Sequence, residues 1–90
     1  MTKWIIEDEM HAERQGEFDT FGDALAELRR RAEIPWDQEP NQAPCQSWRT
    51  CVRRYEIIEF DLTESPWREL SRALALEISA SGVQWRIAPH

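Results

Sequence analysis

Three prolines stand within ten positions of the chain, at Pro35, Pro40 and Pro44. Proline lacks a backbone N–H and has a fixed φ angle, so this stretch is incompatible with a regular helix or a central strand. The sequence therefore predicts a long loop, rich in proline and tryptophan, over residues 35–52. Regular structure is confined to the residues on either side. Loops of this length are uncommon in compact domains and often carry function.

One helix is predicted before the loop, over about residues 20–33. Thr20 suits the N-cap position, and Asp23 places a carboxylate in the first turn, where the helix dipole is positive. Pro35 disfavours helical geometry at Ile34 and ends the helix. Apolar side chains recur at three- and four-residue spacing and form one face. They are Phe21, Leu25, Leu28 and Ala32.

Strands are predicted on both sides of the helix and loop. Residues 3–10 begin with an apolar run typical of a strand, and a turn at residues 14–17 leads into a short second strand that ends near Phe18. Residues 54–62 alternate apolar and polar side chains and form the clearest strand.

Residues 66–87 allow two interpretations. In the first, Pro66 begins a helix that Gly82 ends. In the second, which we favour, two alternating runs form a hairpin whose turn includes Gly82, with a helical turn over residues 66–70. The predicted fold is then a single α+β domain over residues 1–90, with one helix packed on an antiparallel sheet of about four strands.

Composition excludes several classes of protein. The 90-residue chain carries a formal net charge of −6, which argues against general nucleic-acid binding. The longest apolar runs are too short for a signal peptide or a membrane helix, so we expect a cytoplasmic protein without membrane association. Two cysteines do not make a disulfide framework.

Motifs of catalysis are absent from the sequence. It contains no nucleophile elbow, phosphate-binding loop, glycine-rich dinucleotide fingerprint or HExxH zinc motif. Paired acids such as Glu7, Asp8 and Glu9 are typical of a solvated strand face. We therefore expect a protein that is not an enzyme and has no cofactor.

The segment from Arg29 to Arg54 differs in charge from the rest of the chain. It holds six arginines and three acids, and aromatic side chains lie among them. Arginine beside aromatic rings is typical of protein interfaces and of anion-binding surfaces. In the simpler alternative, the tryptophans dock the loop and the arginines pair with surplus acids. The candidate binding residues are Trp36, Asn41, Trp48, Arg49, Arg53 and Arg54.

Cys45 and Cys51 are the only cysteines. Arg49 and Arg53 flank Cys51, and nearby cations favour a reactive thiolate. A thiol switch or a metal site is thus one interpretation of the pair. Another is that both thiols are small packing groups.

The residues from Ile34-Pro35-Trp36-Asp37 through Ala43-Pro44-Cys45 to Arg54-Tyr55-Glu56 resemble a family of small bacterial proteins that has no assigned activity. The resemblance continues through Pro66-Trp67-Arg68 and implies a bacterial origin, but it transfers no site.

The sequence as a whole favours a small binding or regulatory module that uses residues 35–54. Its partner is expected to be another protein, with a weak anionic-ligand or nucleic-acid interaction as the alternative. The oligomeric state stays open.

Overall fold

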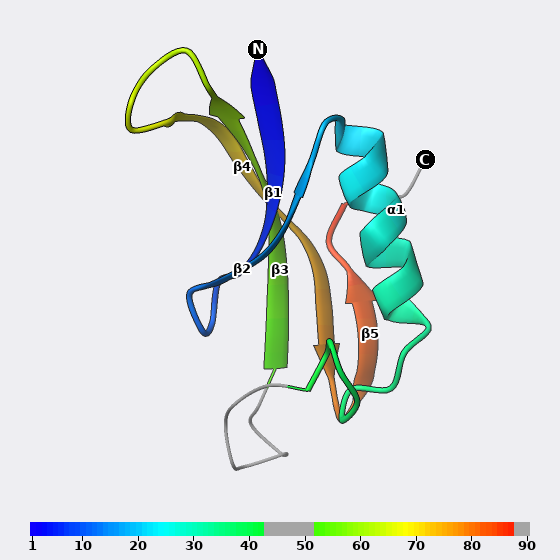
Figure 1. The fold of residues 1–90 in the computed structure, drawn as a ribbon. Helices are drawn as coiled ribbons and strands as arrows, with labels where there is room; N and C mark the ends of the chain where they lie inside the picture. Colours follow the sequence, from blue (N-terminus) through cyan, green and yellow to red (C-terminus); the bar gives the residue numbers. More distant parts are fainter. Residues whose placement is uncertain (43–51, 88–90) are drawn as a thin grey trace.

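The computed structural model describes residues 1–42 and 52–87 and shows one helix packed on one face of a five-stranded sheet (Figure 1). All neighbouring strands are antiparallel, in the order β2-β1-β3-β4-β5. The predicted α+β class is confirmed, with five strands where about four were expected. The elements are β1 (Thr2–Asp8), β2 (Glu13–Phe18), α1 (Phe21–Ala32), β3 (Val52–Asp61), β4 (Arg68–Ser79) and β5 (Gly82–Trp85).

The hairpin prediction for residues 66–87 is confirmed. β4 and β5 pair antiparallel around a turn at Ala80 and Ser81, and Gly82 has a φ of 126°, which a glycine adopts without strain. The helical alternative is wrong, and so is the helical turn expected at residues 66–70, because Arg68 already lies in β4.

The turn between the first two strands lies earlier than predicted. Residues 14–17 belong to β2, and the chain reverses at residues 9–12 instead. Two local features fix this turn: the Asp8 carboxylate accepts a hydrogen bond from the Met10 N–H at 3.1 Å, and Ala12 has a φ of 53°. Asp side chains that bond the backbone two residues on commonly form such turns.

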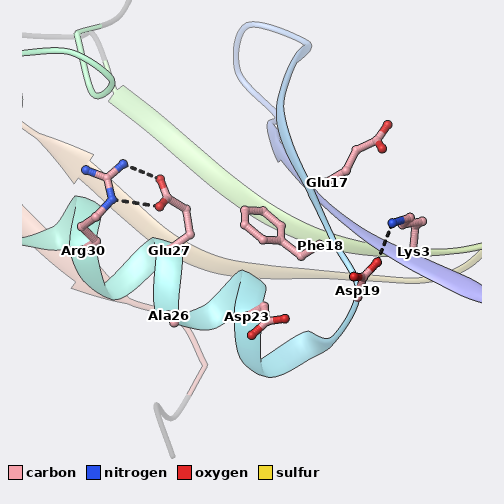
Figure 2. Close-up of a pocket in the computed structure, with 8 residues that line it drawn as sticks. All are labelled: Lys3, Glu17, Phe18, Asp19, Asp23, Ala26, Glu27 and Arg30. Atoms are coloured by element: carbon pink, nitrogen blue, oxygen red, sulfur yellow. Dashed lines mark hydrogen bonds and ion pairs between the residues drawn. The ribbon is translucent and has the colours of Figure 1, made fainter.

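The helix begins where the sequence predicts. Thr20 is the N-cap, and its Oγ1 accepts a hydrogen bond from the Asp23 N–H at 3.0 Å. Ala24, Leu25 and Leu28 are buried against the sheet. Between α1 and β2 lies a shallow groove, seen in Figure 2.

Replacing Thr20 with alanine is expected to lower the free energy of unfolding by about 1 kcal/mol, because the Asp23 N–H loses its acceptor. Urea denaturation followed by circular dichroism measures the change. Thr20→Ser keeps the hydroxyl and serves as the control, with stability close to that of the original protein. Equal losses in the two variants would contradict the capping role.

The core has two parts, one on each face of the sheet. The main cluster, on the helix side, joins α1 to β1, β3 and β4. Its buried members are Ile6, Ala24, Leu28, Tyr55, Ile57, Ala75, Leu76 and Ile78. A smaller cluster consists of Ile5, Ile58 and Phe60, with Trp67 packed beside Phe60 and the Arg14 guanidinium 5.0 Å from the centre of the Phe60 ring.

Charged side chains cross four strands of the sheet. Arg72 on β4 donates hydrogen bonds to Glu56 on β3 at 2.8 Å and to Glu7 on β1 at 3.1 Å, and it pairs with Glu69 on its own strand. Arg14 on β2 pairs with Glu7 from the other side. Hydrogen bonds to Glu69 and then to Glu56 raise the pKa of Arg72. Because Glu7 and Glu56 are register partners, Arg72 removes a cross-strand repulsion.

No helix among the described residues is long and apolar enough to cross a membrane.

Candidate functional site

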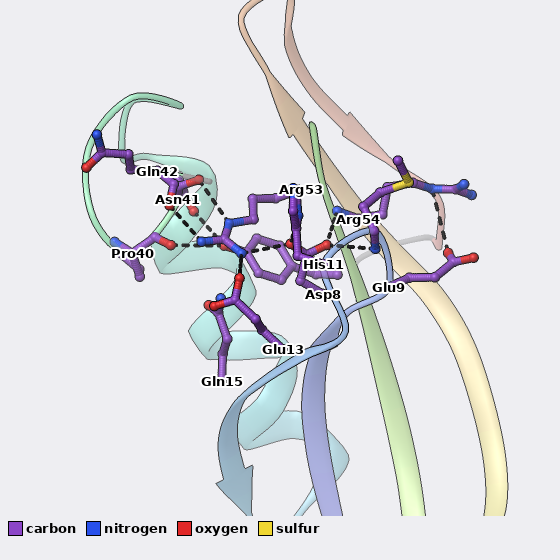
Figure 3. A network of polar contacts seen from close by, with 12 residues as sticks. Asp8, Glu9, His11, Glu13, Gln15, Pro40, Asn41, Gln42, Arg53 and Arg54 are labelled. Carbon is purple, nitrogen blue, oxygen red and sulfur yellow. Dashed lines mark hydrogen bonds and ion pairs between the residues drawn. The ribbon is translucent and has the colours of Figure 1, made fainter. Parts of the chain in front are cut away.

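A buried polar network lies where the β1–β2 turn, the segment after α1 and the start of β3 meet (Figure 3). Its centre is Arg53, whose side chain is 6% exposed. The guanidinium donates to Asp8 Oδ2 and Glu13 Oε1, both at 2.8 Å, and to the backbone carbonyls of Asn41 at 3.1 Å and Gln42 at 2.6 Å. These four hydrogen bonds come from all three nitrogens of the planar guanidinium.

Asp8 is the buried acid of the network, with 0% exposure. Its Oδ1 accepts from the backbone N–H groups of Met10 and Arg54, both at 3.1 Å. Its Oδ2 lies 2.5 Å from His11 Nδ1 and also accepts from Arg53. A buried carboxylate is stable only when it is paired and hydrogen-bonded, and Asp8 meets both conditions.

Asn41 joins the network to the end of the helix. Its Nδ2 donates to the carbonyls of Arg31 and Ile34, both at 2.8 Å, and its Oδ1 accepts from the Tyr55 hydroxyl at 3.1 Å. The last carbonyls of a helix have no partner within the helix. Asn41 adds a side-chain donor to the Arg31 carbonyl, which also accepts from the Ile34 N–H at 3.0 Å, and thereby fixes the segment that follows α1 onto the sheet.

Tyr55 and Arg31 extend the network along the helix side of the sheet. The Arg31 guanidinium lies 5.2 Å from the centre of the Tyr55 ring and donates to Glu27 and Gln15. Burial raises the pKa of the Tyr55 hydroxyl, so this group stays protonated as a donor. Hydrogen bonds from Arg30 and then from Arg31 lower the pKa of Glu27 against the opposing effect of burial.

Burial also bears on the charge of Arg53. Loss of solvent opposes that charge, but the hydrogen bonds to Asp8 and Glu13 outweigh it and raise the pKa of Arg53. The site therefore holds a permanent internal cation. We call Asp8, Glu13, Asn41, Arg53 and Tyr55 the Arg53 network.

The structure brings only part of the predicted binding set together. Asn41 and Arg53 are in direct contact, and both are buried. Trp36 is partly buried and packs against the main core cluster. Arg54 pairs with Glu77 at 3.0 Å. The other four predicted residues, Cys45, Trp48, Arg49 and Cys51, lie outside the described residues.

Sequence reasoning missed three members of the Arg53 network: Asp8, Glu13 and Tyr55. Asp8 was expected on a solvated face, and its burial shows that expectation to be wrong. A signal was present, because Trp4, Ile6 and Asp8 share one side of a strand of period two. Partners that lie far away in the sequence could not be inferred from this pattern.

Asp8, His11 and Glu13 offer ligand atoms within 4.8 Å of one another, as a metal site requires. Arg53 Nη1, however, lies 2.8 Å from an oxygen of each carboxylate. A divalent cation would have to displace this guanidinium and then leave it buried. The arrangement therefore favours a structural role, in which Arg53 supplies the positive charge.

No family model, curated protein or solved structure matches this chain in the comparisons.

Proposed function

We propose that this protein is a small, non-enzymatic binding or regulatory module that uses residues 35–54. One observation carries the proposal. Arg53, next to the start of β3, donates hydrogen bonds to the backbone carbonyls of Asn41 and Gln42. This buried side chain, which we call the anchor, therefore joins the residues just before segment 43–51 to those just after it.

A fixed anchor supports binding for an entropic reason. Association costs less when part of the ordering is complete before binding, and here Arg53 already holds the residues that precede segment 43–51. This segment contains Trp48 and Arg49, and tryptophan and arginine are the side chains most enriched at the centres of interfaces. A protein partner fits this combination best.

The ion pairs weaken the alternative of an anionic ligand or nucleic acid. Arg30 and Arg31 bond Glu27, Arg53 bonds Asp8, and Arg54 pairs with Glu77. Four of the six arginines in this part of the sequence are therefore engaged in ion pairs within the protein. Phosphate binding needs unpaired arginine or lysine at the surface.

The test compares two variants that each remove a Trp–Arg pair. In Trp48→Ala/Arg49→Ala the pair lies in the proposed binding region. In the control, Trp67→Ala/Arg68→Ala, it lies at the opposite end of the sheet, where both side chains are exposed. Immobilised protein is used to isolate partners from cells, and each partner is then produced and its affinity measured by calorimetry.

The expected result is a partner whose affinity falls by at least about tenfold with the first variant and stays unchanged with the control, since interface hot spots contribute about 2 kcal/mol or more. Thermal unfolding is measured for both variants. Loss of cooperative unfolding in Trp48→Ala/Arg49→Ala alone would make the region structural and overturn the proposal. Equal affinity in both variants would also overturn it.

The alternative at Cys45 and Cys51 is tested separately. A Cys45→Ser/Cys51→Ser variant would lose any thiol-dependent partner or bound metal and leave a binding surface built on Trp48 and Arg49 intact. Partner affinity unchanged in this double variant therefore favours the binding module over a thiol switch.

A further inference from the structure

A shallow groove of about 490 Å³ lies between β2 and α1 (Figure 2). It is distinct from the Arg53 network and from residues 35–54. The end of β2 forms one wall, and exposed helix side chains form the other. Its lining consists of Lys3, Glu17, Phe18, Asp19, Asp23, Ala26, Glu27 and Arg30.

The groove borders an edge of the sheet. β2 is the first strand in the sheet order, and β1 is its one neighbour among the described strands. The outer edge of such a strand presents backbone N–H and C=O groups to any extended chain beside it. Adding a strand to an exposed edge is a general mode of peptide recognition.

Charge indicates what kind of chain the groove favours. Four carboxylates line it against two cations, Lys3 and Arg30. Both cations are already engaged: Lys3 bonds Asp19, and Arg30 bonds Glu27 at 2.9 and 2.7 Å. The remaining acids are Glu17 and Asp23, so the lining keeps a net charge of −2.

A second copy of this surface would be repelled by the same charge, in a protein whose formal net charge is already −6. A basic chain is attracted. Phe18 and Ala26 add an apolar part to the lining, which suits small apolar side chains alternating with basic ones. An extended chain projects alternate side chains to opposite faces, as this arrangement requires.

We propose that the groove between β2 and α1 binds an extended basic segment of another protein as a strand added to the edge of β2. This binding goes beyond the function proposed for residues 35–54 and does not depend on it.

The first test uses a peptide of alternating lysine and valine, blocked at both ends, and ¹⁵N-labelled protein. Backbone amide signals are followed by NMR as the peptide is added. The expected shifts fall on residues 16–19, which include the end of β2 and the residue after it, and on residues 23–30 of α1. Shifts confined to other elements, or none at millimolar peptide, would overturn the proposal.

The second test asks which charges carry the binding. In Glu17→Gln/Asp23→Asn, affinity for the peptide is expected to fall about five- to tenfold, because each exposed charge pair contributes up to about 1 kcal/mol. Asp37→Asn/Glu39→Gln makes the same change of charge outside the groove and should leave affinity unchanged. A larger loss in this control would place the peptide at residues 35–54, overturning the groove proposal without harming the proposed function.

The third test separates strand addition from simple charge attraction. Two peptides are methylated on the backbone nitrogens of either all lysines or all valines. In an extended peptide these two sets of N–H groups point to opposite edges. One methylated peptide is therefore expected to lose binding and the other to retain it. Equal retention by both would show that the peptide does not pair with β2 and would overturn the proposal.

Discussion

Replacing Arg53 with methionine is expected to lower the free energy of unfolding by about 3–5 kcal/mol, the usual result of removing one partner from a buried ion pair. The methionine side chain fills much of the same space but leaves Asp8 buried at 0% exposure without its cation. The carbonyls of Asn41 and Gln42 also lose their donor. Urea denaturation followed by tryptophan fluorescence measures the loss.

The neighbouring Arg54 provides a matched control. Arg54→Met removes the same side chain one position later in β3, where the arginine is 33% exposed and pairs with Glu77 and Glu9. Surface ion pairs contribute at most about 1 kcal/mol, so this variant should stay near the original stability. Equal losses in the two variants would contradict a special role for Arg53.

A double variant isolates the pair itself. Asp8→Asn/Arg53→Met removes the buried negative charge together with its partner. Its loss of stability should be smaller than the sum of the two single losses by about 0.5–3 kcal/mol, as expected for residues in direct contact. Strict additivity would mean that Asp8 and Arg53 stabilise the fold independently.

Replacing Asn41 with alanine is expected to lower the free energy of unfolding by about 2–3 kcal/mol, because each buried polar group left unsatisfied costs about 1–3 kcal/mol. The change removes the side-chain donor to the carbonyls of Arg31 and Ile34 and the nearer acceptor of the Tyr55 hydroxyl. The Ile34 carbonyl loses a buried donor, whereas the Arg31 carbonyl keeps the Ile34 N–H. Circular dichroism during thermal and urea unfolding measures the effect.

Two further variants define the origin of this loss. Gln42→Ala changes the next residue, which is exposed and contributes its backbone carbonyl to Arg53, so its stability should change by no more than about 0.5 kcal/mol. Tyr55→Phe removes one of the hydrogen bonds of Asn41 and should cost about 1 kcal/mol. An Asn41→Ala variant as stable as Gln42→Ala would show that Asn41 does not hold the segment after α1.

The two largest predicted effects therefore fall on residues that the sequence suggested for binding. Asn41 and Arg53 lie inside the protein, and within the proposed function they position the segment between them. This distinction is measurable, because loss of a positioning residue lowers stability as well as partner affinity. Loss of a contact residue lowers affinity alone.

The helix could be predicted from the sequence because its signals are local. Thr20, the apolar spacing and Pro35 act within a few residues of one another, and the helix ends where they indicate. The β4–β5 hairpin was also predictable, because alternating side chains and Gly82 specify it over a short stretch.

The sequence prediction for the β1–β2 turn was wrong because this turn depends on contacts of Asp8 that local sequence signals do not show. Gly16 suggested a turn at residues 14–17, but the chain turns where Asp8 can bond the Met10 N–H. A hydrogen bond from Arg53, a residue far away in the sequence, holds the Asp8 carboxylate in that position. Local turn signals did not reveal this contact.

Local sequence signals were sufficient to predict one helix, the alternating strands, the hairpin at the C-terminal side and an interruption at the prolines. Each of these depends on side-chain period or on backbone chemistry over a few residues. The pairings of Asp8 with Arg53 and of Glu56 with Arg72 required the tertiary structure. Asp8 and Arg53 are 45 residues apart, and only the pairing of β1 with β3 brings them within 2.8 Å. Burial then makes that contact decisive, because a charge removed from water must find an opposite charge inside the protein.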